Sequence, residues 1–323
     1  MDVVRVGVVG AGAMGANHLR VYSELRGVEL VGVYDTKPDR AEQASQRHGC
    51  RAFSSLADLA ESVDAVSITA SSSAHADIGE QLLQRGVACL IEKPLAPTPG
   101  ECERLLKAAE SAAAVLCVGH IERFNPVVMQ MQTMLSTETQ IYAIDARRLS
   151  ATSRRIDDVD VIVDLMVHDL DIVRLLNPSP VKSVHASASG LHPGAVDHAI
   201  VSLEFENGSV AGLTASRITQ NKIRQFQVIT ESQLIEADLA AQQLRVYHDS
   251  EVRMNLESAH SPYRLDLSVE KVLIRYAEPL VRELNHFVDS ARRNVVPLIS
   301  GEDAFETMEL LWRVQAAIHG KEG

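Results

Sequence analysis

Two groups of residues have the types and the spacing needed for proton and hydride chemistry. The first is the tripeptide Glu92-Lys93-Pro94, which directly follows an apolar run at residues 87–91. A lysine at the end of a buried strand can point its ammonium into the crevice where open α/β sheets bind ligands. Pro94 lacks an N–H and fixes the exit of the chain. Alone, the tripeptide fits a solvated lysine at a strand end better, so its surroundings must decide.

The second group lies in a predicted helix at residues 159–176. Asp164, His168 and Asp171 fall at i, i+4 and i+7, which places them on one helical face. An Asp four residues before a His can hold the imidazole in one tautomer, so that its other nitrogen takes or gives a proton. A structural Asp-His pair is the alternative. We predict no metal site, because no cysteine or second histidine has metal-ligand spacing.

Four arginines close to this helix form a basic cluster in an acidic protein. Arg147, Arg148, Arg154 and Arg155 fall within nine residues. Solvated charge is the usual explanation for such a cluster. Its position between a predicted strand and the Asp/His helix favours anion binding by at least one of these arginines.

The first half of the chain carries a dinucleotide-binding pattern. An apolar run at residues 3–9 ends in Gly-Ala-Gly-Ala-Met-Gly at 10–15, and a helical pattern follows. The glycines permit a tight turn and close approach to a pyrophosphate, and the helix N-terminus adds N–H groups. A second strand, at 29–34, ends at Asp35, 20 residues after Gly15. A carboxylate there hydrogen-bonds the adenosine ribose and favours NAD. NADP is the alternative, because Lys37 and Arg40 lie close by and can accommodate its 2′-phosphate.

Polar residues follow the next predicted strand, at 65–70. Ser71, Ser72 and Ser73 can approach the ribose or phosphates of a cofactor, although an ordinary helix N-cap explains them equally well. His75 opens the following helix and is either a cofactor contact or a surface histidine. Arg123, just after the last predicted strand of this half, can reach cofactor or substrate.

The order of elements predicts an α/β fold with a Rossmann-type, doubly wound parallel sheet, followed by an α+β region with an open, mainly antiparallel sheet. Thr98 with Glu101 predicts a capping box, and Asn125 with Pro126 a second helix cap. Asn207-Gly208 predicts a hairpin with a type I′ turn. We predict domains at 1–121 and 122–323. The elements are helices at 74–85 and 99–113, and strands at 87–91, 115–118, 140–149, 181–189, 199–205, 210–216 and 226–230.

Composition narrows the class of protein. The chain has 323 residues, 46% of them hydrophobic, and a formal net charge of −12, which argues against binding nucleic acid or an anionic membrane. No signal peptide or membrane-spanning run is recognisable. The four cysteines form no CxxC pair, which indicates reduced thiols in a cytoplasmic protein. These cysteines are Cys50, Cys89, Cys102 and Cys117.

Taken together, these motifs resemble the glucose-fructose oxidoreductase, inositol dehydrogenase and rhizopine-catabolism (Gfo/Idh/MocA) family over essentially the whole chain. The matching residues are GAGAMG at 10–15, Asp35, His75, EKP at 92–94 and DLMVHDLD at 164–171. The resemblance implies NAD as cofactor, Lys93 between nicotinamide and substrate with a Lys93-Pro94 bond that is often cis, and Asp164 and His168 near the hydroxyl to be oxidised. It also implies an open sheet that pairs between subunits, hence a homodimer or homotetramer.

Within the family, two segments are similar to UDP-N-acetylglucosamine 3-dehydrogenases: VGHIERFNP at 118–126 and ARR at 146–148. This similarity implies oxidation of the sugar 3-hydroxyl to a ketone, which a PLP-dependent aminotransferase converts to a 3-amino sugar for lipid A or other glycans. A UDP-sugar diphosphate would account for the arginines at 147–155. The alternatives are a dehydrogenase of inositol, a free sugar or the uronate of UDP-N-acetylglucosamine, and a non-catalytic NAD-binding sensor.

The working hypothesis makes His168 the base, oriented by Asp164, while Lys93 stabilises the developing alkoxide. The roles of Lys93 and His168 are exchangeable, because a lysine beside bound NAD and apolar residues can have a lowered pKa. The predicted cofactor contacts are Gly10, Gly12, Ala13, Met14, Gly15, Asp35, Ser71, Ser73, His75, Glu92, Lys93 and Arg123. The predicted substrate contacts are Lys93, Arg123, Asn125, Arg148, Arg154, Arg155, Asp164 and His168.

Overall fold

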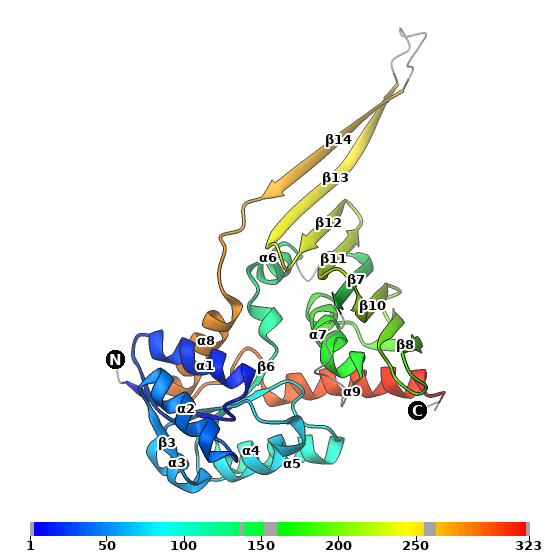
Figure 1. Cartoon of the computed structure of the whole chain (residues 1–323). Coiled ribbons are helices and arrows are strands. Elements are labelled where there is room, and N and C mark those ends of the chain that lie inside the picture. The colour runs from blue at the N-terminus through cyan, green and yellow to red at the C-terminus, as the bar shows by residue number, and fades with distance from the viewer. Residues whose placement is uncertain (1–2, 136–138, 152–159, 255–262, 321–323) are drawn as a thin grey trace. The chain divides into compact units, whose positions relative to one another are not determined.

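A computed structural model describes residues 3–135, 139–151, 160–254 and 263–320, with side chains for all of these except 249–267 (Figure 1). The chain forms two compact units. The first comprises residues 1–124 and 277–309, and the second comprises residues 125–276 and 310–323. Each unit has its own sheet.

The first unit contains a six-stranded, fully parallel sheet in the order β3-β2-β1-β4-β5-β6. Its strand order reverses between β1 and β4, and ligands of open α/β sheets bind at such a switch point, beyond the carboxyl ends of the strands. The strands are β1 (Val4–Val9), β2 (Val28–Tyr34), β3 (Arg51–Phe53), β4 (Ala65–Ile68), β5 (Ala88–Glu92) and β6 (Leu116–Gly119). The predicted Rossmann-type sheet is confirmed.

Helices connect these strands, and their caps follow local sequence. Thr98 accepts a hydrogen bond from the Glu101 N–H at 3.4 Å, and the Glu101 carboxylate accepts one from the Thr98 N–H at 3.1 Å. The predicted capping box is therefore confirmed. The helices are α1 (Ala13–Glu24), α2 (Pro38–His48), α3 (Leu56–Ser62), α4 (His75–Leu83) and α5 (Pro99–Ala112), with 3₁₀ turns η1 (Ser72–Ala74) and η2 (Ile121–Phe124).

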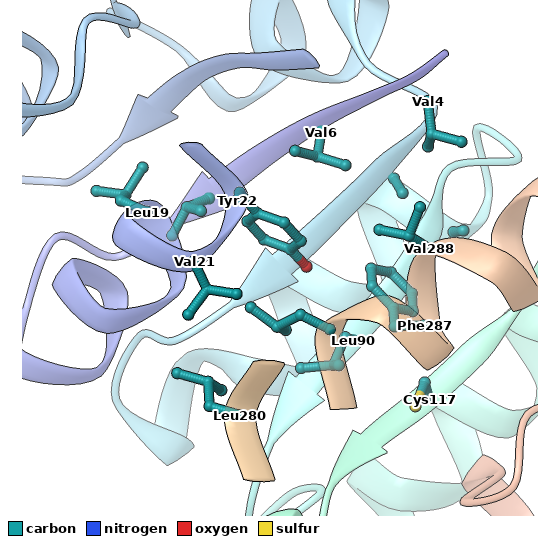
Figure 2. Close-up of a cluster of buried hydrophobic side chains, with 14 of the residues drawn as sticks. Val4, Val6, Leu19, Val21, Tyr22, Leu90, Cys117, Leu280, Phe287 and Val288 are labelled. Atoms are coloured by element: carbon teal, nitrogen blue, oxygen red, sulfur yellow. The ribbon is translucent and has the colours of Figure 1, made fainter. Parts of the chain in front are cut away.

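A helix from late in the chain, α8 (Pro279–Arg293), completes the core of the first unit. Its apolar face buries Leu280, Leu284 and Phe287 in one cluster with Tyr22 of α1 and Cys117 of β6 (Figure 2). The compact units therefore differ from the predicted division at residue 121, because this apolar face needs the sheet of the first unit to leave water.

The second unit contains an eight-stranded sheet in the order β14-β13-β12-β11-β7-β10-β9-β8. Neighbouring strands are antiparallel except β7 and β10, which are parallel. The strands are β7 (Ile141–Ala151), β8 (Val181–Ser189), β9 (His198–Phe205), β10 (Val210–Thr219), β11 (Ile223–Thr230), β12 (Gln233–Asp238), β13 (Gln243–Met254) and β14 (Tyr263–Val272). The predicted α+β fold with a mainly antiparallel sheet is confirmed.

One face of this sheet is covered by helices. The π-helical turn η3 (Ile162–Met166) contacts β10, α7 (Val167–Leu176) contacts β7, and α6 (Pro126–Met134) contacts β12. Asn125 caps α6 as predicted, because its Oδ1 accepts the Val127 N–H at 3.1 Å. Residues from 310 onward in α9 (Gly301–Ile318) also belong to this unit. No helix among the described residues is long and apolar enough to cross a membrane.

The hairpin between β9 and β10 forms where Asn207-Gly208 predicts it. The type I′ assignment is wrong, because only Gly208 of this pair has a positive φ, 84°. The Phe205 carbonyl accepts the Gly208 N–H at 3.0 Å, and Asn207 Oδ1 accepts the Ser209 N–H at 3.1 Å. The Asn207 side chain therefore stabilises the turn without a left-handed backbone at its own position.

Candidate active site

The loop after β1 has three glycines, of which two are required by the backbone and one borders open space. Gly10 has φ of 97°, and a Cβ at Gly15 would lie 1.9 Å from the Gly10 carbonyl oxygen, so both positions require glycine. Thr69 fixes the same turn, because its hydroxyl is 2.7 Å from the Gly10 carbonyl oxygen. A Cβ at Gly12, however, would meet no described atom within 4 Å.

The open space at Gly12 lies at the N-terminus of α1, where Gly12 is the N-cap and supplies no side-chain hydrogen bond. The predicted contacts Ala13 and Met14 form the first turn of this helix. Free space beside helical N–H groups fits the pyrophosphate of a dinucleotide.

Asp35 has its carboxylate held beside this loop. Its Oδ2 accepts the Ala11 N–H at 2.8 Å, and its Oδ1 accepts the Lys37 N–H at 2.8 Å. A carboxylate has about four lone-pair sites, so each oxygen can accept a further bond from a ribose hydroxyl. Asp35 and the glycine loop together fit the adenosine end of NAD.

Ser71, Ser73 and His75 follow β4, at the same end of the sheet. The two serines are exposed, and their hydroxyl oxygens lie 3.3 Å apart. His75 is buried, with Nδ1 2.9 Å from the Pro94 carbonyl oxygen and Nε2 3.1 Å from that of Ala70. Burial lowers the pKa of His75 below its ordinary value. The surface-histidine alternative is therefore wrong, and a contact of His75 with the cofactor stays a prediction.

Lys93 follows the last residue of β5 and is half-buried. The Lys93-Pro94 peptide bond is cis, in agreement with the family resemblance. Glu92 is buried, and its Oε1 lies 3.0 Å from Nε2 of His18 in α1. Lys93 follows the carboxyl end of β5, as the glycine loop follows β1 and Asp35 follows β2. Because these strands are parallel, all three lie at the same edge of the sheet, as predicted.

Arg123 is buried and paired with a carboxylate. Its Nη1 lies 2.6 Å from Oδ2 of Asp303, which lies in α9. This pair neutralises the charge of Arg123 within the first unit, so the arginine is not an isolated cation. Its contacts with cofactor or substrate stay predictions.

In the second unit, the Asp/His helix is not a regular α-helix. Asp164 lies in the π-helical turn and His168 at the start of α7, and both are half-buried, whereas Asp171 is fully buried. The three groups therefore differ in burial, and the π turn changes the helical spacing between Asp164 and His168, whereas His168 and Asp171 lie in the same α-helix. Their shared face toward a ligand stays a prediction. Single π turns within helices occur frequently at functional sites.

Arg148 forms a buried ion pair that attaches this helix to the sheet. Its Nε and Nη2 lie 2.8 Å and 2.7 Å from Oδ1 of Asp169, and the side chains are only 3% and 2% exposed. Arg147 is exposed on the opposite face of β7. Of the other predicted substrate contacts, Asn125 donates to the Leu239 carbonyl at 3.0 Å, and Arg154 and Arg155 lie outside the described residues.

Removing the Arg148 guanidinium should destabilise the protein strongly. Arg148→Met leaves Asp169 as a buried charge without this partner, which typically costs about 3–5 kcal/mol. The free energy of unfolding, measured in urea, would show this loss, while the exposed control Arg147→Met should change it by less than about 0.5 kcal/mol. Equal effects of the two variants would contradict a stabilising role of the pair.

Several residues of these sites were not predicted from the sequence. They are His18, Thr69, Asp169 and Asp303. Asp169 lies beside His168 in the His-Asp-Leu-Asp segment, which is a weak signal. His18 is a single histidine on the buried face of α1, and such a residue alone does not indicate a contact with Glu92. Among side chains that the structure describes, no group of three or more His, Cys, Asp or Glu residues could hold a metal ion.

Comparison with known proteins agrees with this geometry. The model of an oxidoreductase family with an NAD-binding Rossmann fold matches residues 4–120, and the model of the GFO/IDH/MocA C-terminal domain matches residues 139–236. The chain belongs to the Gfo/Idh/MocA family. UDP-N-acetylglucosamine 3-dehydrogenase of Acidithiobacillus ferrooxidans is 34% identical over 245 residues, which cover 76% of this chain and 77% of the relative.

A solved structure of this relative and a second family member show how far the likeness extends. A solved structure of the Acidithiobacillus ferrooxidans enzyme superposes with a TM-score of 0.90 at 29% identity, covering 99% of both chains. Inositol 2-dehydrogenase of Rhizobium meliloti is 28% identical over 321 residues, covering 95% of this chain and 94% of the relative. As a Gfo/Idh/MocA protein, the chain is an NAD-dependent oxidoreductase of the type that acts on CH–OH groups.

The glycine loop gives a matched test of cofactor binding. Gly12→Ala should fold normally but weaken NAD binding about tenfold or more, because its methyl group occupies space that the pyrophosphate needs. Gly15→Ala should instead destabilise the protein by about 1–3 kcal/mol, because its Cβ clashes with backbone. Calorimetric NAD titration and thermal unfolding separate the two effects. Unchanged NAD affinity in Gly12→Ala would place the pyrophosphate elsewhere.

Proposed function

We propose that the protein oxidises the 3-hydroxyl of UDP-N-acetylglucosamine to a ketone, with NAD as oxidant. The observation that carries this proposal is the likeness to the Acidithiobacillus ferrooxidans enzyme, which extends over both units. The joint presence of Lys93, Asp164 and His168 supports it, because a non-catalytic NAD sensor would not need these three residues together. The likeness to inositol dehydrogenases supports only the coarser class of dehydrogenase.

The proposed chemistry separates a proton from a hydride. His168 takes the proton of the 3-hydroxyl, and Asp164, one turn earlier in the helix, holds the imidazole in the required tautomer. Lys93 donates a hydrogen bond to the same oxygen and stabilises its developing negative charge. When bound, NAD accepts the hydride from C3, and the carbon–oxygen bond becomes a double bond. The site residues stay proposals, with Lys93 able to exchange roles with His168.

Arginines are proposed to recognise the diphosphate of the substrate. Arg123 and Arg148 already pair with Asp303 and Asp169. A guanidinium has five N–H donors, so one carboxylate partner does not by itself prevent a second anion contact. Asn125 completes the proposed set, together with Arg154 and Arg155.

A product assay tests the function directly. The enzyme is incubated with NAD and UDP-N-acetylglucosamine, with and without a PLP-dependent aminotransferase, and the products are identified by mass spectrometry and NMR. We expect a 3-keto sugar nucleotide alone and a 3-amino sugar nucleotide with the aminotransferase, consistent with a place in lipid A or other glycan synthesis.

The alternative substrates define the outcomes that contradict this proposal. A higher kcat/KM for myo-inositol, a free sugar or UDP-N-acetylglucosamine uronate would assign the protein to another dehydrogenase of the family. Tight NAD binding without hydride transfer to any of these compounds would support the sensor.

We also propose that the open face of the eight-stranded sheet joins subunits into a homodimer or homotetramer. Along β9, buried Ala199, Val201 and Leu203 alternate with exposed residues such as Ile200. Further large apolar side chains are exposed on other strands of this sheet: Tyr142, Val210, Ile229 and Val269. Exposed apolar side chains on an uncovered sheet face favour burial against a partner.

Placing a charge on this face should dissociate the oligomer. Ile200→Glu would bury an unpaired carboxylate in the proposed interface, so we expect a large shift toward monomer, at least about tenfold in the dissociation constant. Light scattering over a range of concentrations measures it. Val296→Glu, at a position that is 82% exposed in the first unit, is the control. A wild-type protein that is monomeric throughout would contradict the proposal.

A cytoplasmic location is proposed from the thiols. All four cysteines are free, and Cys89, Cys102 and Cys117 are buried. Burial raises the pKa of Cys102 to about 12 and also raises the pKa values of Cys89 and Cys117 above the ordinary value. Such thiols are unreactive core residues, as expected in a reducing compartment.

A further inference from the structure

Two buried histidines from different helices contact the residues on either side of Lys93. His18 of α1 contacts the side chain of Glu92, at 3.0 Å from Nε2 to Oε1. His75 of α4 contacts the main chain of Pro94, at 2.9 Å from Nδ1 to the carbonyl oxygen. The segment that presents Lys93 is therefore attached to two separate helices.

The His18 contact uses a defined atom of the ring. Nε2 donates to the Glu92 carboxylate, and Nδ1 has no hydrogen-bond partner among the described residues. Neither side chain has much access to water, because His18 is fully buried and Glu92 is nearly so. Loss of this bond would leave a carboxylate buried without its donor, which is costly.

Glu283 of α8 is a second buried carboxyl group in the same unit. It is fully buried, and its oxygens have no hydrogen-bond partner among the described residues. Burial, and secondarily the charge of Glu92, raise the pKa of Glu283 well above its ordinary value. Burial therefore favours the neutral form of the Glu283 carboxyl in this core.

The His75 contact joins two strand ends. Its ring lies between the carbonyl oxygens of Pro94 and Ala70, at 2.9 Å and 3.1 Å. Burial lowers the pKa of His75, so the ring is neutral at pH 7 and donates its single N–H to one of these carbonyls at a time. With the proton on Nδ1, the ring donates to the Pro94 carbonyl and is held against the peptide that follows Lys93.

We propose that His18 and His75 are positioning residues that together fix the Lys93 ammonium at the carboxyl end of the sheet. The consequence for turnover rests on the proposed catalytic function of Lys93, whereas the positioning does not. Misplacement of a catalytic group by about 1 Å can reduce a rate about 10²-fold. Loss of the His18 or His75 contact would displace the Lys93 ammonium. We therefore expect it to lower kcat more than it changes KM.

Paired substitutions distinguish the hydrogen bonds from mere packing. Glutamine carries its amide N–H₂ where Nε2 lies in histidine, and asparagine carries it where Nδ1 lies. His18→Gln and His75→Asn therefore keep the donors to Glu92 and Pro94, whereas His18→Asn and His75→Gln move them. His18→Leu and His75→Leu remove them.

His286→Leu is the matched control. His286 of α8 is partly buried in the same unit and accepts the Leu298 N–H at 2.8 Å, but it has no described contact with residues 92–94. Its loss should destabilise the protein without moving Lys93.

The readout that does not depend on activity is the ¹³C resonance of Lys93 after reductive dimethylation, which keeps the charge. The variant Lys93→Arg identifies this resonance by its disappearance, and spectra are recorded without cofactor. Turnover of UDP-N-acetylglucosamine and calorimetric NAD affinity are measured in parallel.

We expect the leucine and donor-moving variants to shift or broaden the Lys93 resonance and to reduce kcat about 10-fold to 10²-fold. In the His18 variants, KM and NAD affinity should stay nearly unchanged, because His18 is not among the predicted cofactor or substrate contacts. His18→Gln and His75→Asn should retain the wild-type resonance and most of kcat. An unshifted resonance in the donor-moving variants, or an equal shift in His286→Leu, would overturn the proposal. A wild-type enzyme that oxidises no sugar nucleotide would contradict the proposed function, and the resonance would still test the positioning.

Discussion

Replacing Lys93 with alanine should reduce kcat about 10³-fold, because the developing alkoxide loses a charged hydrogen-bond donor. NAD affinity should change less than about tenfold, since Asp35 and the glycine loop remain. Initial rates of NADH formation and NAD titration separate these effects. Added ethylamine should restore part of the activity if the cavity left by the side chain admits it.

A surface lysine of the same unit is the control for this result. Lys107 of α5 is 77% exposed and pairs with Glu103 of the same helix. Lys107→Ala should keep kcat within about twofold of the wild-type value. If Lys93→Ala retained wild-type kcat, Lys93 would not be a catalytic residue.

Replacing His168 with alanine has the second large expected effect, a fall in kcat of about 10²-fold to 10⁴-fold, because a positioned base contributes a factor of this size. Added imidazole should restore part of the rate of His168→Ala and none of the rate of Lys93→Ala. Steady-state kinetics at saturating substrate measure both.

The pair of variants also assigns the base. His185→Ala, on exposed β8, is the control and should leave kcat within about twofold. If His168→Ala kept nearly full turnover while Lys93→Ala lost it, the base would be Lys93. The present assignment of the proton to His168 would then be wrong.

The buried ion pair beside His168 links Arg148 to the helix that carries His168. Asp169 follows His168 in sequence and attaches α7 to β7 through Arg148. Substitutions at Arg148 can therefore reduce activity by moving the helix, without any contact with a diphosphate. Rates should be compared with the free energy of unfolding before Arg148 is assigned to substrate binding.

The fold of both units could be predicted largely from local sequence. Apolar runs followed by glycine or serine locate the Rossmann strands, and Thr98 with Glu101 locates the start of α5. Strands β12 to β14 were not predicted. The turn between β12 and β13 contains neither glycine nor proline, and Gln242 adopts the positive φ of 51° there. A turn of ordinary residues gives no local signal.

The sequence by itself determined the residue types available for chemistry: the glycine loop, Asp35, Lys93, Asp164 and His168. Their signals are local, because each depends on the strand or helix that the neighbouring residues form. Only the tertiary structure decided the partners of the site residues, since His18 and Glu92 are 74 residues apart and Arg148 and Asp169 are 21 apart. It also decided that Glu283 is buried within the first unit. Contacts between distant segments form only when whole sheets and helices pack, and no local pattern specifies them.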